Sequence, residues 1–181
     1  MTTATTEGTP PAILWFRQDL RLQDHAALEA AMAGGRAVLP VYVLDDATAG
    51  AWAAGGAARW WLHHTLTSLA RSLQERGSTL ILRRGRAAEV IPELARAAGA
   101  TTVHAGRMHE PWARQSDADV ARALAPAAAL HLHRTATLFD LDSVCTKTGG
   151  IYGVYTPFAR TCRGLGVVHG PTPAPDRIPC P

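Results

Sequence analysis

Short apolar runs alternate with helical patterns as far as residue 133, and this alternation is the feature that most constrains the fold. Five runs, at residues 12–16, 38–44, 79–82, 101–104 and 130–133, predict buried β-strands. Between them, residues 25–32, 57–76, 86–98 and 111–125 are typical of helices. We therefore expect a Rossmann-like, three-layer α/β/α fold, in which a doubly wound five-stranded parallel sheet carries helices on both faces.

Glycine and proline support the boundaries of these elements. Gly34-Gly35, Gly77 and Gly99 each follow a helical pattern, where a left-handed backbone that favours glycine often ends a helix. Pro111 suits the first position of the fourth helix, because that position needs no backbone donor.

The outer segments differ in composition from this core. Residues 1–11 are rich in threonine and predict a disordered tail, and residues 12–135 predict one α/β domain core. We expect residues 136–169 to form a loop and a short helix, over 156–164, that complete the domain. The prolines of residues 170–181 predict the start of an interdomain linker.

Composition argues against several classes of protein. Eighteen Lys and Arg against fifteen Asp and Glu are scattered, which does not predict a nucleic-acid-binding stripe. The apolar runs are shorter than the roughly 20 residues of a membrane span, so no membrane partner is expected. Cys145, Cys162 and Cys180 have no metal-site or disulfide spacing, which fits a reducing cytoplasm. The pairs His63-His64 and His131/His133 have no third ligand nearby in the sequence, and we expect no metal.

Five stretches in order carry a family resemblance. They are Trp15–Leu22 (WFRQDLRL), Pro40–Asp45 (PVYVLD), Arg59–Leu69, Glu110–Arg114 with Asp117, and Tyr152–Phe158 (YGVYTPF). With them the chain resembles the N-terminal α/β domain of the DNA photolyase/cryptochrome family; Gln18 departs from the usual Arg.

The resemblance implies an antenna and scaffold domain of a light-dependent DNA repair flavoprotein, a deoxyribodipyrimidine photo-lyase acting on cyclobutane pyrimidine dimers. In that family FAD and damaged DNA are bound by a helical C-terminal domain, which these residues lack, so we expect no catalytic residue here. Two alternatives stay open: a cryptochrome-type blue-light photoreceptor, and a stand-alone nucleotide-binding α/β domain without photochemistry.

The resemblance also implies where an antenna pigment is held. The candidate cofactor-binding residues are Tyr42, Val43, Leu44, Asp45, Arg59, Met108 and Glu110. Apolar and aromatic walls suit a flat ring, Arg59 can donate to its polar edge, and Glu110 can accept. Met108 stands where the deazaflavin-type pattern more often has an acid.

The identity of the pigment is narrowed by the fourth helix. The folate-binding pattern has Asn-Glu where this chain has Trp112 and Ala113, so an 8-hydroxy-deazaflavin is favoured over folate, and a flavin antenna stays open.

Two other groups of residues predict structure more than binding. Arg17, Asp19 and Arg21 follow the first strand and are expected to form an ion-pair and capping network. Of Trp60 and Trp61, we expect at least one to pack against the sheet, since aromatic rings supply large apolar burial.

Overall fold

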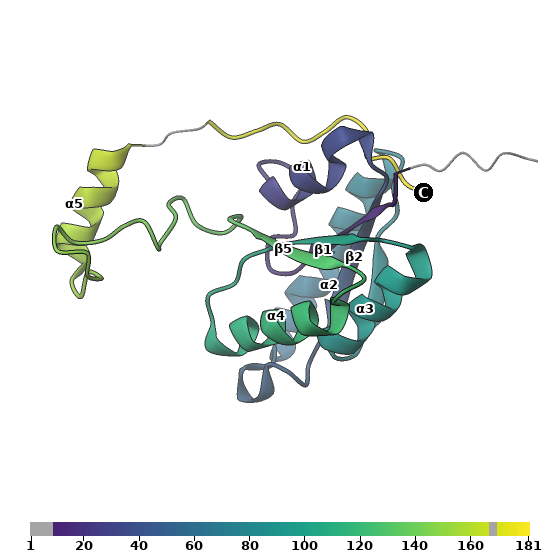
Figure 1. Ribbon diagram of the computed structural model, residues 1–181, viewed down its shortest axis with the longest axis horizontal. Helices are drawn as coiled ribbons and strands as arrows, with labels where there is room; N and C mark the ends of the chain where they lie inside the picture. The colour runs from purple at the N-terminus through teal and green to yellow at the C-terminus, as the bar shows by residue number, and fades with distance from the viewer. Residues whose placement is uncertain (1–8, 167–169) are drawn as a thin grey trace, which may run out of the picture.

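The computed structural model describes residues 9–166 and 170–181, and within them the predicted doubly wound sheet is confirmed (Figure 1). The parallel strands are β1 (Ala12–Phe16), β2 (Val38–Leu44), β3 (Ile81–Arg84), β4 (Thr102–Gly106) and β5 (Ala129–His133), in the order β3-β2-β1-β4-β5. The helices are α1 (Ala26–Met32), α2 (Gly56–Gln74), α3 (Ala87–Ala98), α4 (Pro111–Leu124) and α5 (Tyr155–Leu165). Short 3-10 turns occupy Ala33–Gly35 and Gly50–Trp52.

The central strand β1 is buried on both faces, which makes the molecule three layers deep. Ile13 and Trp15 pack in one cluster with Ile91 of α3 and residues of α4, whereas Leu14 packs in a second cluster with α1 and α2. Successive side chains of a strand point to opposite faces, so the continuous apolar run of β1 serves both clusters.

The helix boundaries follow from local chemistry. Gly99 ends α3 in the left-handed conformation, with φ of 63°, as its position predicts. His25 precedes α1, and its ring nitrogen Nδ1 accepts a hydrogen bond from the Leu28 N–H at 3.2 Å. An orphan donor of the first turn is thereby satisfied.

Strand β3 begins two residues later than the apolar run predicts. The pairing joins Ile81 to Val41 and Arg84 to Leu44, so that β3 extends to the carboxyl end of β2. Because β3 lies at the edge of the sheet, Arg83 and Arg84 can face solvent within it.

Residues 170–181, expected to be a linker, pack against the domain as an extended strap. Ile178 is fully buried between α1, α2 and the sheet, and its N–H donates to the carbonyl of Arg76 at 2.9 Å. Pro179 accepts from the Val38 N–H at 2.7 Å. The prolines keep the segment extended, as expected, but Ile178 makes it part of the core.

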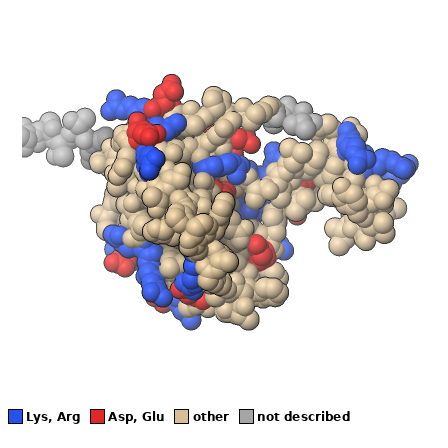
Figure 2. All heavy atoms as spheres, turned by 180° about the vertical axis from the view of Figure 1, so that it is seen from behind, with Lys and Arg blue, Asp and Glu red and all other residues tan. Residues whose placement is uncertain are grey.

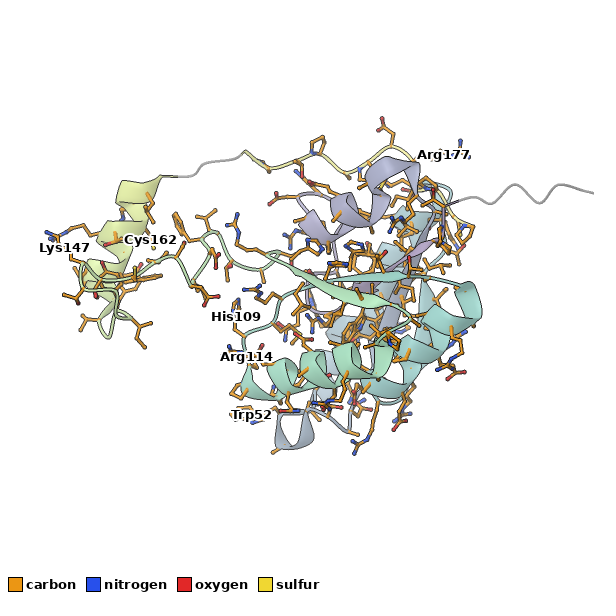
Figure 3. All side chains as sticks on the ribbon, viewed as in Figure 1. Trp52, His109, Arg114, Lys147, Cys162 and Arg177 are labelled. Carbon is orange, nitrogen blue, oxygen red and sulfur yellow. The ribbon has the colours of Figure 1, made fainter. Side chains whose placement is uncertain are left out.

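Residues 136–166 form an arm that ends in α5 and stands apart from the three layers (Figure 1). The arm has a small core of its own, in which the Tyr152 hydroxyl and Thr161 Oγ1 lie 2.7 Å apart. Lys147 and Cys162 lie on this arm, and Arg177 lies on the far side of the body (Figure 3). The expected helix is present, but it does not pack on the sheet as a completing element; residues 167–169 lie outside the described part.

The expected disordered tail, residues 1–11, lies outside the described residues except for its last three. Among the residues that the structure does describe, no helix is both long and apolar enough to cross a membrane. On the face shown in Figure 2, Lys and Arg of the described residues are interspersed with Asp and Glu rather than massed into a stripe.

Candidate functional site

A cavity of about 490 Å³ opens at the carboxyl edge of the sheet. It is bounded by the ends of β1 and β2, the start of α2 and the first turns of α4. In the order β3-β2-β1-β4-β5 the direction of winding reverses between β1 and β4. Open α/β sheets bind ligands at this edge and near this switch point.

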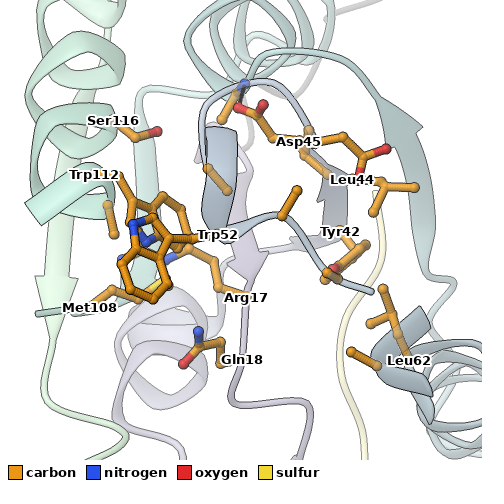
Figure 4. A pocket seen from close by; sticks show the side chains of 18 of the residues that line it. Arg17, Gln18, Tyr42, Leu44, Asp45, Trp52, Leu62, Met108, Trp112 and Ser116 are labelled. Carbon is orange, nitrogen blue, oxygen red and sulfur yellow. Dashed lines mark hydrogen bonds between the residues drawn. The ribbon is translucent and has the colours of Figure 1, made fainter. Parts of the chain in front are cut away.

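Figure 4 shows the rings of Trp52 and Trp112 close together on one side of the cavity, near Met108. Trp52 comes from the turn after β2, Trp61 from α2 and Trp112 from the first turn of α4, and Leu62 and Met108 also line the cavity. Flat apolar surfaces of this kind stack against a planar conjugated ring, and a few polar groups are enough to orient it.

Five of the seven predicted binding residues line this cavity. They are Tyr42, Val43, Leu44, Asp45 and Met108. Arg59 and Glu110 do not line it. Glu110 lies on a neighbouring cavity of about 400 Å³, where its carboxylate accepts from the His109 N–H at 3.1 Å.

Arg59 points to the rim of the cavity and not to its interior. Its guanidinium contacts the carboxylate of Asp46 at 2.8 Å, and its Nε donates to the carbonyl of Ala54. Asp46 also lies 3.3 Å from Nη2 of Arg84. Arg59 is thus engaged in an ion pair at the rim, and its predicted contact with the polar edge of a ring stays a prediction.

Asp45 has an architectural role. Its carboxylate accepts from Thr48 Oγ1 at 2.6 Å and from the Ala87 N–H, the first of α3, at 2.9 Å. Burial acts to raise the pKa of Asp45, but these hydrogen bonds outweigh it and the pKa is lowered. The ionised side chain thus ties the end of β2 to the start of α3.

Tyr42 can donate a hydrogen bond into the cavity. Burial, and then the charge of Asp46, raise the pKa of the Tyr42 phenol above its usual 10. The hydroxyl therefore stays protonated at neutral pH and remains a donor.

A buried ion pair and hydrogen bonds hold the turn after β1, but their main partners lie on other elements and not within the turn, where the sequence predicts them. Arg17 Nη1 lies 2.5 Å from the carboxylate of Asp117 on α4, and the same guanidinium donates to the Gly106 carbonyl. Asp19 lies 3.3 Å from Nε2 of His25. Although burial opposes it, hydrogen bonding to His25 depresses the pKa of Asp19.

The tautomer of His25 follows from its two neighbours. Nδ1 accepts from the Leu28 N–H, so in the neutral ring Nε2 carries the proton and faces Asp19. Arg21 completes the turn by donating to the Thr135 carbonyl at 2.6 Å. These contacts engage Arg17, Asp19 and Arg21 with other protein groups, although Arg17 still lines the cavity.

The three indoles that line the cavity are absent from the binding residues predicted from the sequence. Trp60 and Trp61 are 63% and 68% exposed, so the expectation that at least one of them packs on the sheet is wrong. The apolar residues at the exposed start of α2 are the signal that could have identified binding residues there. A helix that begins at a cavity need not bury its first turns. In the sequence, Trp112 stands out only as a departure from the folate-binding pattern.

Three histidines gather on β4 and β5. His104 Nδ1 lies 3.0 Å from His133 Nε2, and the rings of His104 and His131 stack with centroids 5.1 Å apart. Among residues 9–166 and 170–181, no group of three His, Cys, Asp or Glu is arranged to hold a metal ion.

The molecule is a doubly wound α/β domain with an aromatic cavity at the carboxyl edge of its sheet, which is the edge where such sheets bind ligands. The family model for DNA photolyase matches residues 12–176, and the chain belongs to that family. It is 37% identical over 174 residues to a deoxyribodipyrimidine photo-lyase of Agrobacterium fabrum, covering 96% of this chain and 36% of the relative. It is 36% identical over 176 residues to a cryptochrome DASH of Natronomonas pharaonis, covering 94% and 37%.

The fold agrees with these sequence matches. A bacterial class III photolyase from Agrobacterium tumefaciens superposes with a TM-score of 0.89 at 35% identity, over all of this chain and 37% of that structure. The chain thus spans little more than a third of the length of the relatives it matches, and it corresponds to their N-terminal domain.

Proposed function

We propose that this chain is the antenna and scaffold domain of a light-dependent DNA repair flavoprotein of the deoxyribodipyrimidine photo-lyase type. The observation that carries the proposal is the cavity walled by Trp52, Trp61 and Trp112 at the carboxyl edge. A chromophore bound there would absorb blue or near-UV light and pass the excitation energy to the FAD of the remaining part of the protein. Binding of FAD and of damaged DNA is assigned to that remaining part.

The proposed ligand is a planar conjugated chromophore, with an 8-hydroxy-deazaflavin as the first choice. Its ring would stack on the indoles and on Met108, and the Tyr42 hydroxyl would donate to a polar edge. The position of Arg59 outside the cavity removes one support for a deazaflavin over a flavin, so both are tested below.

A cryptochrome photoreceptor would use the same domain in the same way. The stand-alone nucleotide-binding alternative is less well supported, because the turn after β1 is where such domains cradle phosphate on glycine-rich backbone. Here that turn holds Arg17 and Asp19, which are engaged by Asp117 and His25. The unpaired cysteines Cys145, Cys162 and Cys180 support a cytoplasmic setting.

Titration of the purified chain with a deazaflavin, a reduced folate and a flavin, followed by chromophore fluorescence, tests the proposal. At least one should bind, and Trp112→Ala should weaken its binding by about tenfold through loss of stacking. Trp60→Ala removes an exposed indole that does not line the cavity and should leave binding unchanged. Failure of all three chromophores to bind would refute the antenna site.

A further inference from the structure

One carboxylate at the rim of the cavity is shared by two guanidinium groups. Asp46 lines the cavity, and its two oxygens contact Arg59 at 2.8 and 3.3 Å and Arg84 at 3.3 Å. Arg59 comes from the first turn of α2 and Arg84 from the end of β3. We call these three residues the rim.

The rim carries more positive than negative charge. Asp45, the neighbouring acid, is directed at Thr48 and at the start of α3, and contributes no contact to either guanidinium. Arg83 and Arg86 lie within two residues of Arg84 in the sequence and add to the positive potential at this edge. Asp46 is therefore a single acceptor for two donors.

The ion pairs of the rim are open to exchange. The side chains of Arg59 and Arg84 are 42% and 77% exposed, and exposed pairs of this kind contribute little to folding stability. An external anion can therefore take over one guanidinium without loss of a buried contact, and arginine binds phosphate or carboxylate through two parallel hydrogen bonds.

From this geometry we propose that Arg59 and Arg84 select chromophores that carry an anionic side chain, phosphate or carboxylate, while the indoles hold the ring. The inference rests on the proposed chromophore site. In this arrangement the positively charged rim binds the anionic side chain of the ligand. Arg59 then contacts that side chain and not the ring. Arg84 becomes a residue that determines specificity.

Riboflavin and flavin mononucleotide test this inference, because they share one ring and differ by a phosphate. Their dissociation constants for the purified chain, measured by quenching of flavin fluorescence, should differ about tenfold in favour of the mononucleotide at low salt. Raising the salt from about 20 mM to about 300 mM should reduce that preference, since the Debye length shortens. The binding of riboflavin should change little.

Variants of the rim separate this role from a structural one. Arg84→Gln should remove most of the preference for the mononucleotide, and Asp46→Asn should strengthen mononucleotide binding by removing the competing carboxylate. Arg122→Gln is the matched control, since it breaks an exposed pair with Asp119 on α4 that does not line the cavity.

The second experiment compares the binding of a folate with and without its glutamate carboxylates. It shows whether the rim binds carboxylate as well as phosphate. Equal binding of both members in each pair, or an unchanged preference in Arg84→Gln, would overturn the inference while leaving the ring site intact. If no flavin, no folate and no deazaflavin bound, the ring site would be refuted, and this inference with it.

Discussion

Arg17 at the end of β1 and Asp117 on α4 form a buried ion pair with an N–O distance of 2.5 Å, and each side chain is only 8% exposed. This pair joins the central strand to the helix whose first turn carries Trp112. Burial raises the pKa of Asp117, and the charge of Arg17 opposes that shift.

Removal of Arg17 should therefore destabilise the domain strongly. Arg17→Met leaves the Asp117 carboxylate buried without its partner, and we expect a loss of about 3–5 kcal/mol in the free energy of unfolding. Urea denaturation followed by circular dichroism measures it. A loss as small as that expected for Arg122→Gln, which breaks an exposed pair, would contradict the account.

The histidines of β4 and β5 should make stability depend on pH. Burial and the neighbouring His133 lower the pKa of His104 to about 4, below the value near 6.5 of an unfolded chain. The unfolded state then binds a proton more readily, so this contribution is complete above about pH 6.5 and is lost as the pH falls towards 4. We expect the free energy of unfolding to decrease by about 2–3 kcal/mol between pH 6.5 and pH 4, as measured by denaturation at several pH values.

His104→Gln should make the free energy of unfolding depend less on pH between 6.5 and 4. His63→Gln, at an exposed position, should leave that dependence unchanged. The lowered pKa of Asp19 acts in a separate window, because that stability is lost only as the pH falls below about 4. An unchanged profile in His104→Gln would show that other groups control the acid transition.

The strap should behave as part of the core. Ile178→Ala removes a fully buried side chain and should lower the free energy of unfolding by about 2–5 kcal/mol. Ile151→Ala makes the same chemical change at a position that is 91% exposed, and should cost less than about 0.5 kcal/mol. Equal thermal shifts for the two variants would mean that the strap is a free linker.

Gly106 is required by close approach, not by its backbone conformation. A Cβ at this position would collide with side-chain oxygens of Asp19 and Thr135. Gly106→Ala should therefore cost about 1–3 kcal/mol, as overpacking does. Gly164→Ala, in α5 with open space around it, should instead be neutral or stabilise by up to about 1 kcal/mol. Thermal denaturation of both variants decides the matter.

The sheet and its helices could be predicted because local patterns determine them. The apolar run of β1, the glycine after α3 and the proline at the start of α4 each act within a few residues. The packing of the strap could not be predicted, since the position of Ile178 depends on a pocket built by α1, α2 and β2. Prolines alone indicate only an extended chain.

The candidate site was predictable to the level of the segment but not of each side chain. The end of β2 and Met108 do line the cavity, because the carboxyl ends of neighbouring strands meet at one edge. The pairing of Arg59 with Asp46 depends on the course of the chain between β2 and α2, which residue types do not specify. The same turn brings Trp52 to the cavity.

The decisive measurement for chromophore binding at the carboxyl edge is the absorption spectrum of the purified chain, produced in a host that makes deazaflavin and in one that lacks it. Ala58 lines the cavity and is exposed, so Ala58→Trp places a large ring in the cavity. Ala57 is also exposed but does not line the cavity, so Ala57→Trp is the matched control. We expect a blue or near-UV band that copurifies with the wild type and with Ala57→Trp but is lost in Ala58→Trp. A band retained equally by both variants, or no bound chromophore from either host, would contradict chromophore binding in this cavity.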